Sequence, residues 1–162
     1  MTVETGTGLA DANSYCEVVQ ADSYHEERGN ADWLDETAAK KAAALVRACD
    51  YLERAYGRLW KGARSSARQK LSFPRFGIED LASDEIPRRL TEAQCEAALL
   101  EILEPGILKQ SPNSGGTILE SQEGETTYRF APGIGSVRHF AAIHGLIACY
   151  IGNPSMVKTE RS

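Results

Sequence analysis

The stretch TAAKKAAALVRACDYLERAYG, residues 37–57, decides the fold of this chain. Its apolar residues recur at the spacing of an α-helix, and they predict one long helix with a single buried stripe. Either Asp35 or Thr37 is expected to cap the start of this helix, and Gly57 is expected to end it. The stripe consists of Ala38, Ala42, Leu45, Val46, Cys49, Leu52 and Tyr56.

Shorter helices are expected on both sides of the long one. The first covers residues 21–28 and ends at Gly29, and another begins at about Pro87 and ends before Pro105. A last helix is expected to begin at a Ser136 cap and to end at Gly152. Its apolar side would consist of Val137, Phe140, Ile143, Ile147 and Ile151.

The remaining segments are a long connection and a predicted hairpin. Residues 57–85 read as an irregular loop, and a loop of this length in a compact domain is often functional. Residues 117–122 and 125–130 read as two strands around a turn, which predicts a β-hairpin. The predicted fold class is therefore mainly α: a small helical bundle of about four helices with a long basic loop and one β-hairpin.

Length and composition are those of an ordinary globular domain. The chain has 162 residues, of which 42% are hydrophobic and 25% are charged. We expect one helical domain over residues 1–152 and a flexible C-terminal tail over residues 153–162, because the tail follows a helix stop and has little to bury. No apolar run approaches the length of a membrane span, and the first residues do not resemble a signal peptide.

The residue types that carry catalysis or bind metals do not form a recognisable motif. The histidines His139 and His144 are five residues apart, so they do not share a helix face as a metal pair would. The cysteines are widely spaced and are expected to be buried free thiols: Cys16, Cys49, Cys95 and Cys149. We therefore expect no enzyme activity, no cofactor and no metal site.

Positive charge is concentrated in one segment. Residues 54–75 contain seven Lys or Arg and no Asp or Glu, although the net charge of the chain is −5. Such a segment is expected to contact a negative partner, which is either nucleic acid or an acidic face of another subunit. A solvated loop whose arginines pair with acidic neighbours is an equally good interpretation. The candidate contact residues are Arg58, Lys61, Arg64 and Arg68.

Aromatic residues alternate with the basic ones in this segment. Trp60 and Phe76 could stack on bases of a single strand. Anchoring of the loop to the helical core is the favoured role for Trp60 and for Phe73.

Several segments together resemble one phage protein family. They are LADANSY at residues 9–15, ADSY at 21–24, RGN at 28–30, AAALVRACDYL at 42–52, LSFPR at 71–75 and Ile86-Pro87 before the next helix. The pentapeptide at 71–75 is close to the pattern L-x-[WF]-P-R of that family. The chain resembles the head–tail connector, or adaptor, proteins of tailed phages, some of which are labelled DnaT-like single-stranded DNA-binding proteins.

This resemblance implies a structural protein of the virion neck, assembled in the cytoplasm of the bacterial host. Its subunits would form a ring, commonly of twelve, between the portal protein and a tail or neck protein, and the ring would extend the DNA channel with only non-specific contact with packaged DNA. The tail residues Met156, Val157 and Lys158 would contact the portal. The alternative is a DnaT-like single-stranded DNA-binding protein, against which the net charge of −5 weighs.

Overall fold

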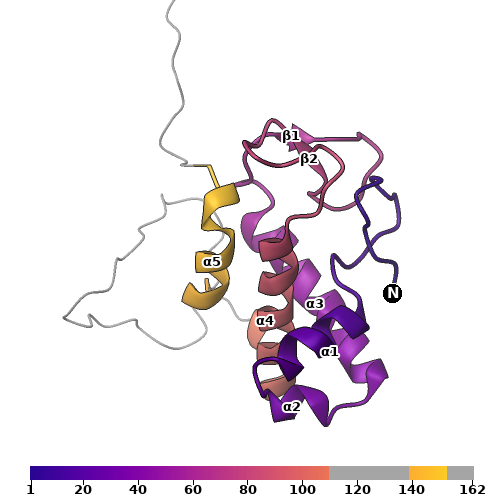
Figure 1. The fold of residues 1–162 in the computed structure, drawn as a ribbon, viewed down its shortest axis with the longest axis vertical. Helices are drawn as coiled ribbons and strands as arrows, with labels where there is room; N and C mark the ends of the chain where they lie inside the picture. Colours follow the sequence, from indigo (N-terminus) through magenta and orange to yellow (C-terminus); the bar gives the residue numbers. More distant parts are fainter. Residues whose placement is uncertain (110–138, 153–162) are drawn as a thin grey trace, which may run out of the picture.

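The computed structural model describes residues 1–109 and 139–152, which fold into a small helical bundle with loops over one end (Figure 1). The mainly α fold class predicted from the sequence is confirmed. In this part of the chain the α-helices are α1 (Val18–Glu26), α2 (Ala31–Leu34), α3 (Ala38–Tyr56), α4 (Arg88–Leu103) and α5 (Ala141–Ile147). Shorter elements are the 3-10 helices η1 (Ile107–Lys109) and η2 (Ala148–Tyr150) and the strands β1 (Ala63–Arg64) and β2 (Arg75–Phe76).

The long helix α3 is close to its prediction. Thr37 is its N-cap, and the threonine hydroxyl accepts a hydrogen bond from the backbone N–H of Lys40 at 3.4 Å. The helix packs most extensively against α4. Its buried surface is wider than one stripe, and Ala38 at the start of the predicted stripe is exposed. The buried apolar residues of α3 are Ala44, Leu45, Ala48, Cys49, Tyr51, Leu52 and Tyr56.

The first helix begins earlier than predicted. Glu17 is the N-cap of α1, and it exchanges capping hydrogen bonds with Gln20, so the helix starts at Val18 rather than at residue 21. The helix ends at Glu26, and Gly29 follows with φ of +65°. A reciprocal cap of this kind stabilises the first turn, and the apolar pattern alone does not reveal it.

Helix α4 begins directly after Pro87, which is its N-cap rather than a residue of its first turn. The buried amide of Gln94 on α4 connects three segments of the chain. It accepts a hydrogen bond from the N–H of Tyr15 and donates to Ser14 Oγ and to the carbonyl of Leu45, each at 2.8 Å. Because all of these buried polar groups are satisfied, the amide fixes the N-terminal segment on the α3–α4 pair.

The C-terminal helix is shorter than predicted. Helix α5 begins at Ala141 with Phe140 as its N-cap, so the prediction that Ser136 caps this helix is wrong. Phe140 is extended, and its ring contacts the ring of Tyr51 with centroids 5.8 Å apart. This ring packs against α3 at the point where α5 begins.

The predicted hairpin at residues 117–122 and 125–130 lies outside the described residues. An antiparallel pair does occur inside the segment that was expected to be irregular, with Ala63 opposite Phe76 and Arg64 opposite Arg75. Buried apolar side chains of the described residues form one cluster that includes Ala12, Leu45, Phe73, Leu90 and Ile147. The domain boundary at residue 152 stays a prediction.

Cysteine burial agrees with the sequence analysis at three of four positions. Cys16, Cys49 and Cys95 are buried free thiols, whereas Cys149 is exposed. Cys149 lies in η2, a short helix whose residues have no buried side chain. The prediction of a buried thiol is therefore wrong for Cys149.

Candidate nucleic-acid interface

The predicted basic residues gather at one end of the molecule. We call this surface the basic end and define it as residues 58–76 together with residues 149–152. It covers the top of the bundle in Figure 1, where β1 and β2 lie beyond the end of α3. Arg58, Lys61, Arg64 and Arg68 are all exposed there, so the structure brings the four candidate residues to one region of the surface.

Two of the four candidates also hydrogen-bond within the basic end. The ammonium of Lys61 donates to the carbonyl of Cys149 at 2.8 Å. The guanidinium of Arg64 donates to the carbonyls of Gln69 and Lys70 at 3.4 and 3.2 Å. These contacts shape the loop, and they leave other N–H groups of both side chains directed to solvent.

Arg58, Arg68 and Lys70 have no side-chain hydrogen bond or ion pair among the described residues. Ion pairs in this part of the chain involve residues outside 54–75, such as Lys41 with Asp22 at 2.9 Å and Arg47 with Glu101 at 2.8 Å. The interpretation of the loop as arginines paired with acidic neighbours is therefore not supported within the described residues. Within the described residues these three side chains have no polar partner, and they are available to an anionic ligand.

Arg75, the last residue of LSFPR, has a structural role. Its side chain is only 8% exposed. The guanidinium donates to the carbonyls of Lys61 and Gly62 at 2.7 Å each, of Ser72 at 3.1 Å and of Trp60 at 3.4 Å. Burial, and after it the charge of Arg64, lower the pKa of Arg75. This residue connects the two sides of the loop, and it is not available to a ligand.

Glu53 on α3 forms hydrogen bonds that hold the basic end to the helical bundle. Its carboxylate accepts hydrogen bonds from the backbone N–H and the hydroxyl of Ser72, at 3.0 and 2.7 Å. It also accepts a hydrogen bond from the hydroxyl of Tyr15, which in turn accepts one from the N–H of Phe73 at 3.1 Å. Burial raises the pKa of Tyr15 well above its usual value, and the charge of Glu53 adds to this shift, so the phenol remains a donor. The LSFPR segment is thus held to α3 and to the N-terminal segment.

The aromatic residues of the basic end divide into two groups. Trp60 and Phe73 are 6% and 0% exposed, which confirms that they anchor the loop to the core and excludes Trp60 as a stacking surface. Phe76 is 53% exposed. Gly62 lies close to it with φ of +67°, and a Cβ at Gly62 would stand 2.2 Å from the carbonyl oxygen of Phe76. Gly62 therefore permits the close approach of the two strands at the exposed phenyl ring.

A segment from the end of the chain completes this surface. Ile151 forms an antiparallel bridge with Trp60. Lys61 N–H donates to the carbonyl of Tyr150 at 2.9 Å, and Gly152 N–H donates to the carbonyl of Leu59 at 2.7 Å. Sequence reasoning missed this pairing, because residues 149–152 read as the end of a helix. The predicted portal-contact residues Met156, Val157 and Lys158 lie outside the described residues.

Acidic residues border the basic end. Glu79, Asp80, Asp84 and Glu85 are exposed and follow β2 directly in the chain. The hydroxyl of Ser65 donates to the carbonyl of Ser83 at 2.5 Å, which places the acidic segment beside the basic one. The acidic segment therefore disfavours an anionic ligand on the part of the basic end next to Ser65.

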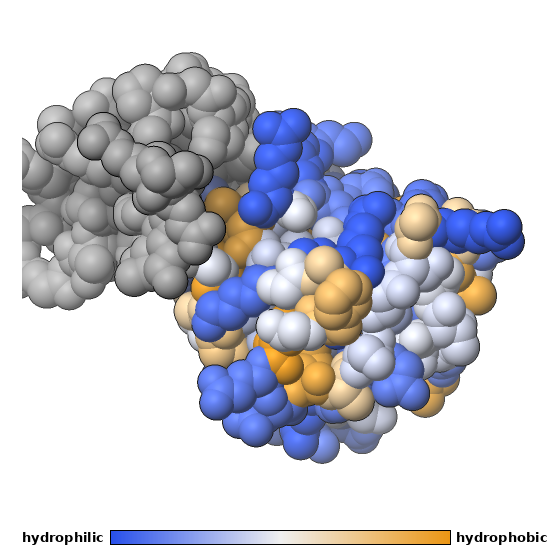
Figure 2. Space-filling model, turned by 90° about the horizontal axis from the view of Figure 1, so that it is seen from above, coloured by the Kyte–Doolittle hydropathy of each residue, from blue (hydrophilic) through white to orange (hydrophobic). Residues whose placement is uncertain are grey.

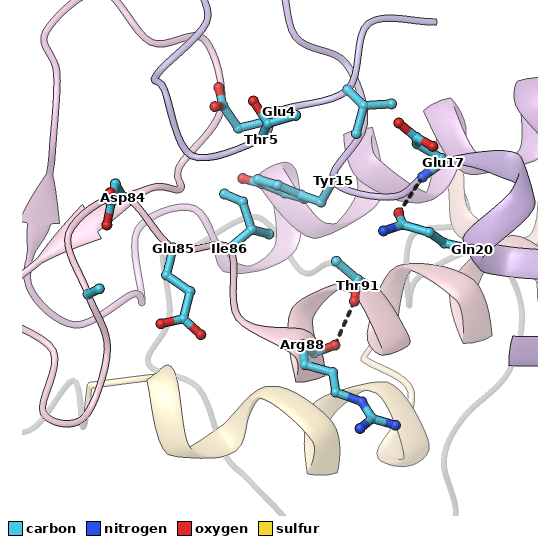
Figure 3. Close-up of a pocket in the computed structure, with 12 residues that line it drawn as sticks. Glu4, Thr5, Tyr15, Glu17, Gln20, Asp84, Glu85, Ile86, Arg88 and Thr91 are labelled. Carbon is cyan, nitrogen blue, oxygen red and sulfur yellow. Dashed lines mark hydrogen bonds between the residues drawn. The ribbon is translucent and has the colours of Figure 1, made fainter.

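An open groove of about 690 Å³ lies on the acidic side. Figure 3 shows Glu17, Asp84 and Glu85 around it, with Arg88 at the start of α4. Arg88 is paired with Glu92 at 2.9 Å, so the groove is acidic overall. It is unsuited to a phosphate group, and we place the candidate interface on the basic end instead.

Figure 2 looks onto the end of the molecule that carries the loops. Long hydrophilic side chains project around the edge of this face, and a small hydrophobic area lies between them. The exposed cations of the basic end and the exposed ring of Phe76 form a combination that is typical of sites that bind single strands.

The described residues lack two other kinds of site, a metal-binding cluster and a membrane-spanning helix. Groups of three or more His, Cys, Asp or Glu that could hold a metal ion do not occur there. His139 and His144, whose rings are 6.5 Å apart, both pack on Tyr56. Helices of the described ranges are also too short or too polar to cross a bilayer.

Comparison with known proteins identifies the family. A family model described as "Putative DnaT-like ssDNA binding protein" matches residues 1–162 of this chain. The chain therefore belongs to this family of DnaT-like proteins. Searches of curated proteins and of solved structures found no match.

Proposed function

We propose that this protein binds single-stranded DNA through the basic end and that it acts by binding rather than by catalysis. Two independent findings support this proposal. The family to which the chain belongs is described by single-stranded DNA binding. The basic end also combines three cations that are unpaired among the described residues with an exposed aromatic ring, Phe76.

The exposed phenyl ring of Phe76 is the observation that carries the proposal. Large aromatic side chains are normally buried in a domain of this size, and this one is 53% exposed beside a cationic segment. A base of a single strand can stack on such a ring, whereas the bases of a duplex are already stacked on one another. The ring therefore favours single strands over duplex DNA.

Phosphate contacts would come from the neighbouring cations. Arg58, Arg68 and Lys70 are free to bind phosphate oxygens, and Lys61 and Arg64 retain donors that could add to them. Such contacts carry no sequence information, so binding is expected to tolerate any sequence. The acidic border and the net charge of −5 limit the number of phosphates held, so affinity should be modest and should fall steeply with salt.

The stacking role is tested by fluorescence anisotropy with a labelled oligothymidylate of about 20 nucleotides. Phe76→Ala should weaken binding by roughly 10-fold, because one stacked base contributes about 1–3 kcal/mol. Val19→Ala is the matched control, since Val19 is 71% exposed on α1, outside the basic end. Equal affinities of the wild-type protein and Phe76→Ala would reject the stacking role.

The phosphate contacts are tested by the salt dependence of the same binding reaction. Each of Arg58→Gln, Arg68→Gln and Lys70→Gln should reduce the slope of log K against log salt by about 0.7. Lys40→Gln is the control, because Lys40 is exposed in the first turn of α3, at the end of that helix away from the basic end. A wild-type protein that does not bind single strands even at low salt would reject the proposed function.

A second candidate is the adaptor role that the sequence resemblance implies. In this role the protein forms a ring, commonly of twelve copies, between the portal and a tail or neck protein of a phage virion, after assembly in the host cytoplasm. The juxtaposition of exposed basic residues with exposed Glu79, Asp80, Asp84 and Glu85 favours it, because the basic side of one copy can face the acidic side of the next.

The two candidates are separated by replacing Arg58, Lys61, Arg64 and Arg68 together by Gln. Native mass spectrometry with a cognate portal measures assembly, and anisotropy measures binding to single strands. Loss of a high-order complex with DNA affinity unchanged supports the adaptor role. Loss of DNA affinity in a protein that remains monomeric with the portal supports single-strand binding.

A further inference from the structure

Two of the buried thiols are in contact although they are 79 residues apart in the sequence. Cys16 immediately precedes the capping residue of α1, and Cys95 lies near the middle of α4. Their sulfur atoms are 3.6 Å apart, and the two residues are 1% and 2% exposed. The N-terminal segment is held in this position by the hydrogen bond from Tyr15 N–H to Gln94 at 2.8 Å, next to the thiol pair.

We propose that Cys16 and Cys95 are a redox pair that forms a disulfide with a small-molecule disulfide as oxidant. The thiolate of one cysteine attacks a sulfur of the oxidant and releases one molecule of small thiol, which takes up the proton. The second cysteine then attacks the resulting mixed disulfide at the protein sulfur and releases a second small thiol. The protein loses two hydrogen atoms, and the oxidant is reduced to two thiols.

The contact distance explains why these two cysteines would pair with each other. A disulfide requires its sulfur atoms to be about 2.05 Å apart, so the pair must approach by about 1.5 Å. We expect rotation of the two short side chains to supply a movement of this size. Among the described residues the other two cysteines are placed differently, since Cys49 lies on α3 and Cys149 is exposed in η2.

Burial determines when the reaction can occur. The contact with Cys16, and after it burial, raise the pKa of Cys95, so the reactive thiolate is rare in the folded protein. Oxidation should therefore be slow in the native state. It should be faster when the N-terminal segment opens or while the chain folds.

The disulfide would stabilise the fold by restricting the unfolded chain. It would close a loop that contains α1, α2, α3 and residues 58–76 of the basic end, and long loops give the largest effect in the chain-entropy model. The oxidised protein should melt about 5–15 °C higher than the reduced protein. This inference does not depend on the proposed binding of DNA.

The test is refolding of the full chain in a glutathione redox buffer. Free thiols are then blocked with iodoacetamide, and the digested protein is analysed by mass spectrometry. We expect a cross-linked peptide pair that contains Cys16 and Cys95, a mass loss of about 2 Da before blocking, and alkylated Cys49 and Cys149. Equal alkylation of all four cysteines, or a scrambled set of pairs, would overturn the proposal.

Two variants make the result specific. Cys49→Ser with Cys149→Ser retains the proposed pair and should show the same cross-link and the same rise in melting temperature on oxidation. Cys95→Ser removes one partner and should abolish both. A cross-link that forms without any rise in melting temperature would also count against the proposal, because it would not be compatible with the native fold.

Discussion

In the helical body, α1 to α4, backbone N–H and C=O groups form hydrogen bonds with one another inside each helix. In the basic end, many backbone carbonyls instead accept hydrogen bonds from side chains. Strands β1 and β2 are two residues long each. Arg75 donates to four backbone carbonyls, and the amide of Gln69 donates to the carbonyls of Leu71 and Pro74 at 2.9 and 3.0 Å. The two regions therefore depend on different kinds of residue.

This difference concerns how sensitive each region is to substitution. A helix has many equivalent hydrogen bonds, and the loss of one side chain leaves them in place. An irregular segment that is held by a few buried polar groups loses several contacts when one of them is removed. We therefore expect the largest single effects on stability at the buried polar groups that hold the basic end in place, although most of the core lies in the helical body.

Arg75→Met should have the largest effect on the free energy of unfolding. Methionine fills much of the volume of the arginine side chain but cannot donate, so four carbonyls lose a charged donor. The expected loss is about 3–5 kcal/mol, measured by urea denaturation at neutral pH. Arg68→Met is the control, because Arg68 is exposed in the same segment, and it should change stability by less than about 0.5 kcal/mol. Similar small losses in both variants would contradict the structural role of Arg75.

Glu53→Gln should have the second largest effect. The carboxylate accepts hydrogen bonds from Ser72 and Tyr15, and an amide would present a donor where these groups also donate. The expected loss is about 1.5–3 kcal/mol in the same measurement. Asp50→Asn on the exposed side of α3 is the matched control and should be almost neutral. If both variants were neutral, the basic end would be held mainly by its apolar anchors.

The helical body could be predicted because its signals are local. The spacing of apolar residues located α3, and Pro87 located the start of α4, since both features act within a few residues. The errors at the ends of elements differ in range. The Glu17–Gln20 capping box that begins α1 is local, whereas Phe140, the N-cap of α5, packs on Tyr51, which is distant in the sequence.

The candidate interface could be predicted only in part. Charge counting identified the basic segment and the four candidate residues, all of which are exposed, because composition is visible in the sequence. It also counted Arg75 with them, since the sequence does not show that this guanidinium is buried against carbonyls. Pairing of residues 149–152 with residues 59–61 was missed, because it joins segments that are almost 90 residues apart and each alone has a weak strand pattern.

A pH titration tests the helical body by a different route. His25 on α1 is fully buried and contacts Trp33, and the charges of Glu96, Arg28 and Asp22 act on its pKa. Burial is the main cause that lowers the pKa of His25 in the folded protein. Below a pH of about 6.5 the unfolded chain therefore binds a proton that the folded protein resists, and stability should fall as the pH decreases.

The measurement compares urea denaturation at neutral and at mildly acidic pH. His25→Gln should lose part of this pH dependence, because glutamine does not titrate. The pH dependence that remains in this variant is expected to come in part from His139, because burial also lowers the pKa of His139. Unchanged pH dependence in His25→Gln would mean that His25 becomes protonated in the folded protein without cost.

The smallest effect on stability is expected for Phe76→Ala and for Arg58→Gln, at the exposed residues that we propose bind DNA. Phe76 already exposes 53% of its surface, so truncation removes little buried area. Arg58 is one of seven cations in a segment without acidic residues, so its removal relieves repulsion. Both variants should stay within about 0.5 kcal/mol of the wild-type free energy of unfolding.

A loss as large as that of Arg75→Met would show that these residues hold the fold, and reduced DNA binding in them could then be explained by unfolding. Near-neutral stability together with weaker binding to single strands would instead show that Phe76 and Arg58 bind DNA, whereas Arg75 stabilises the basic end.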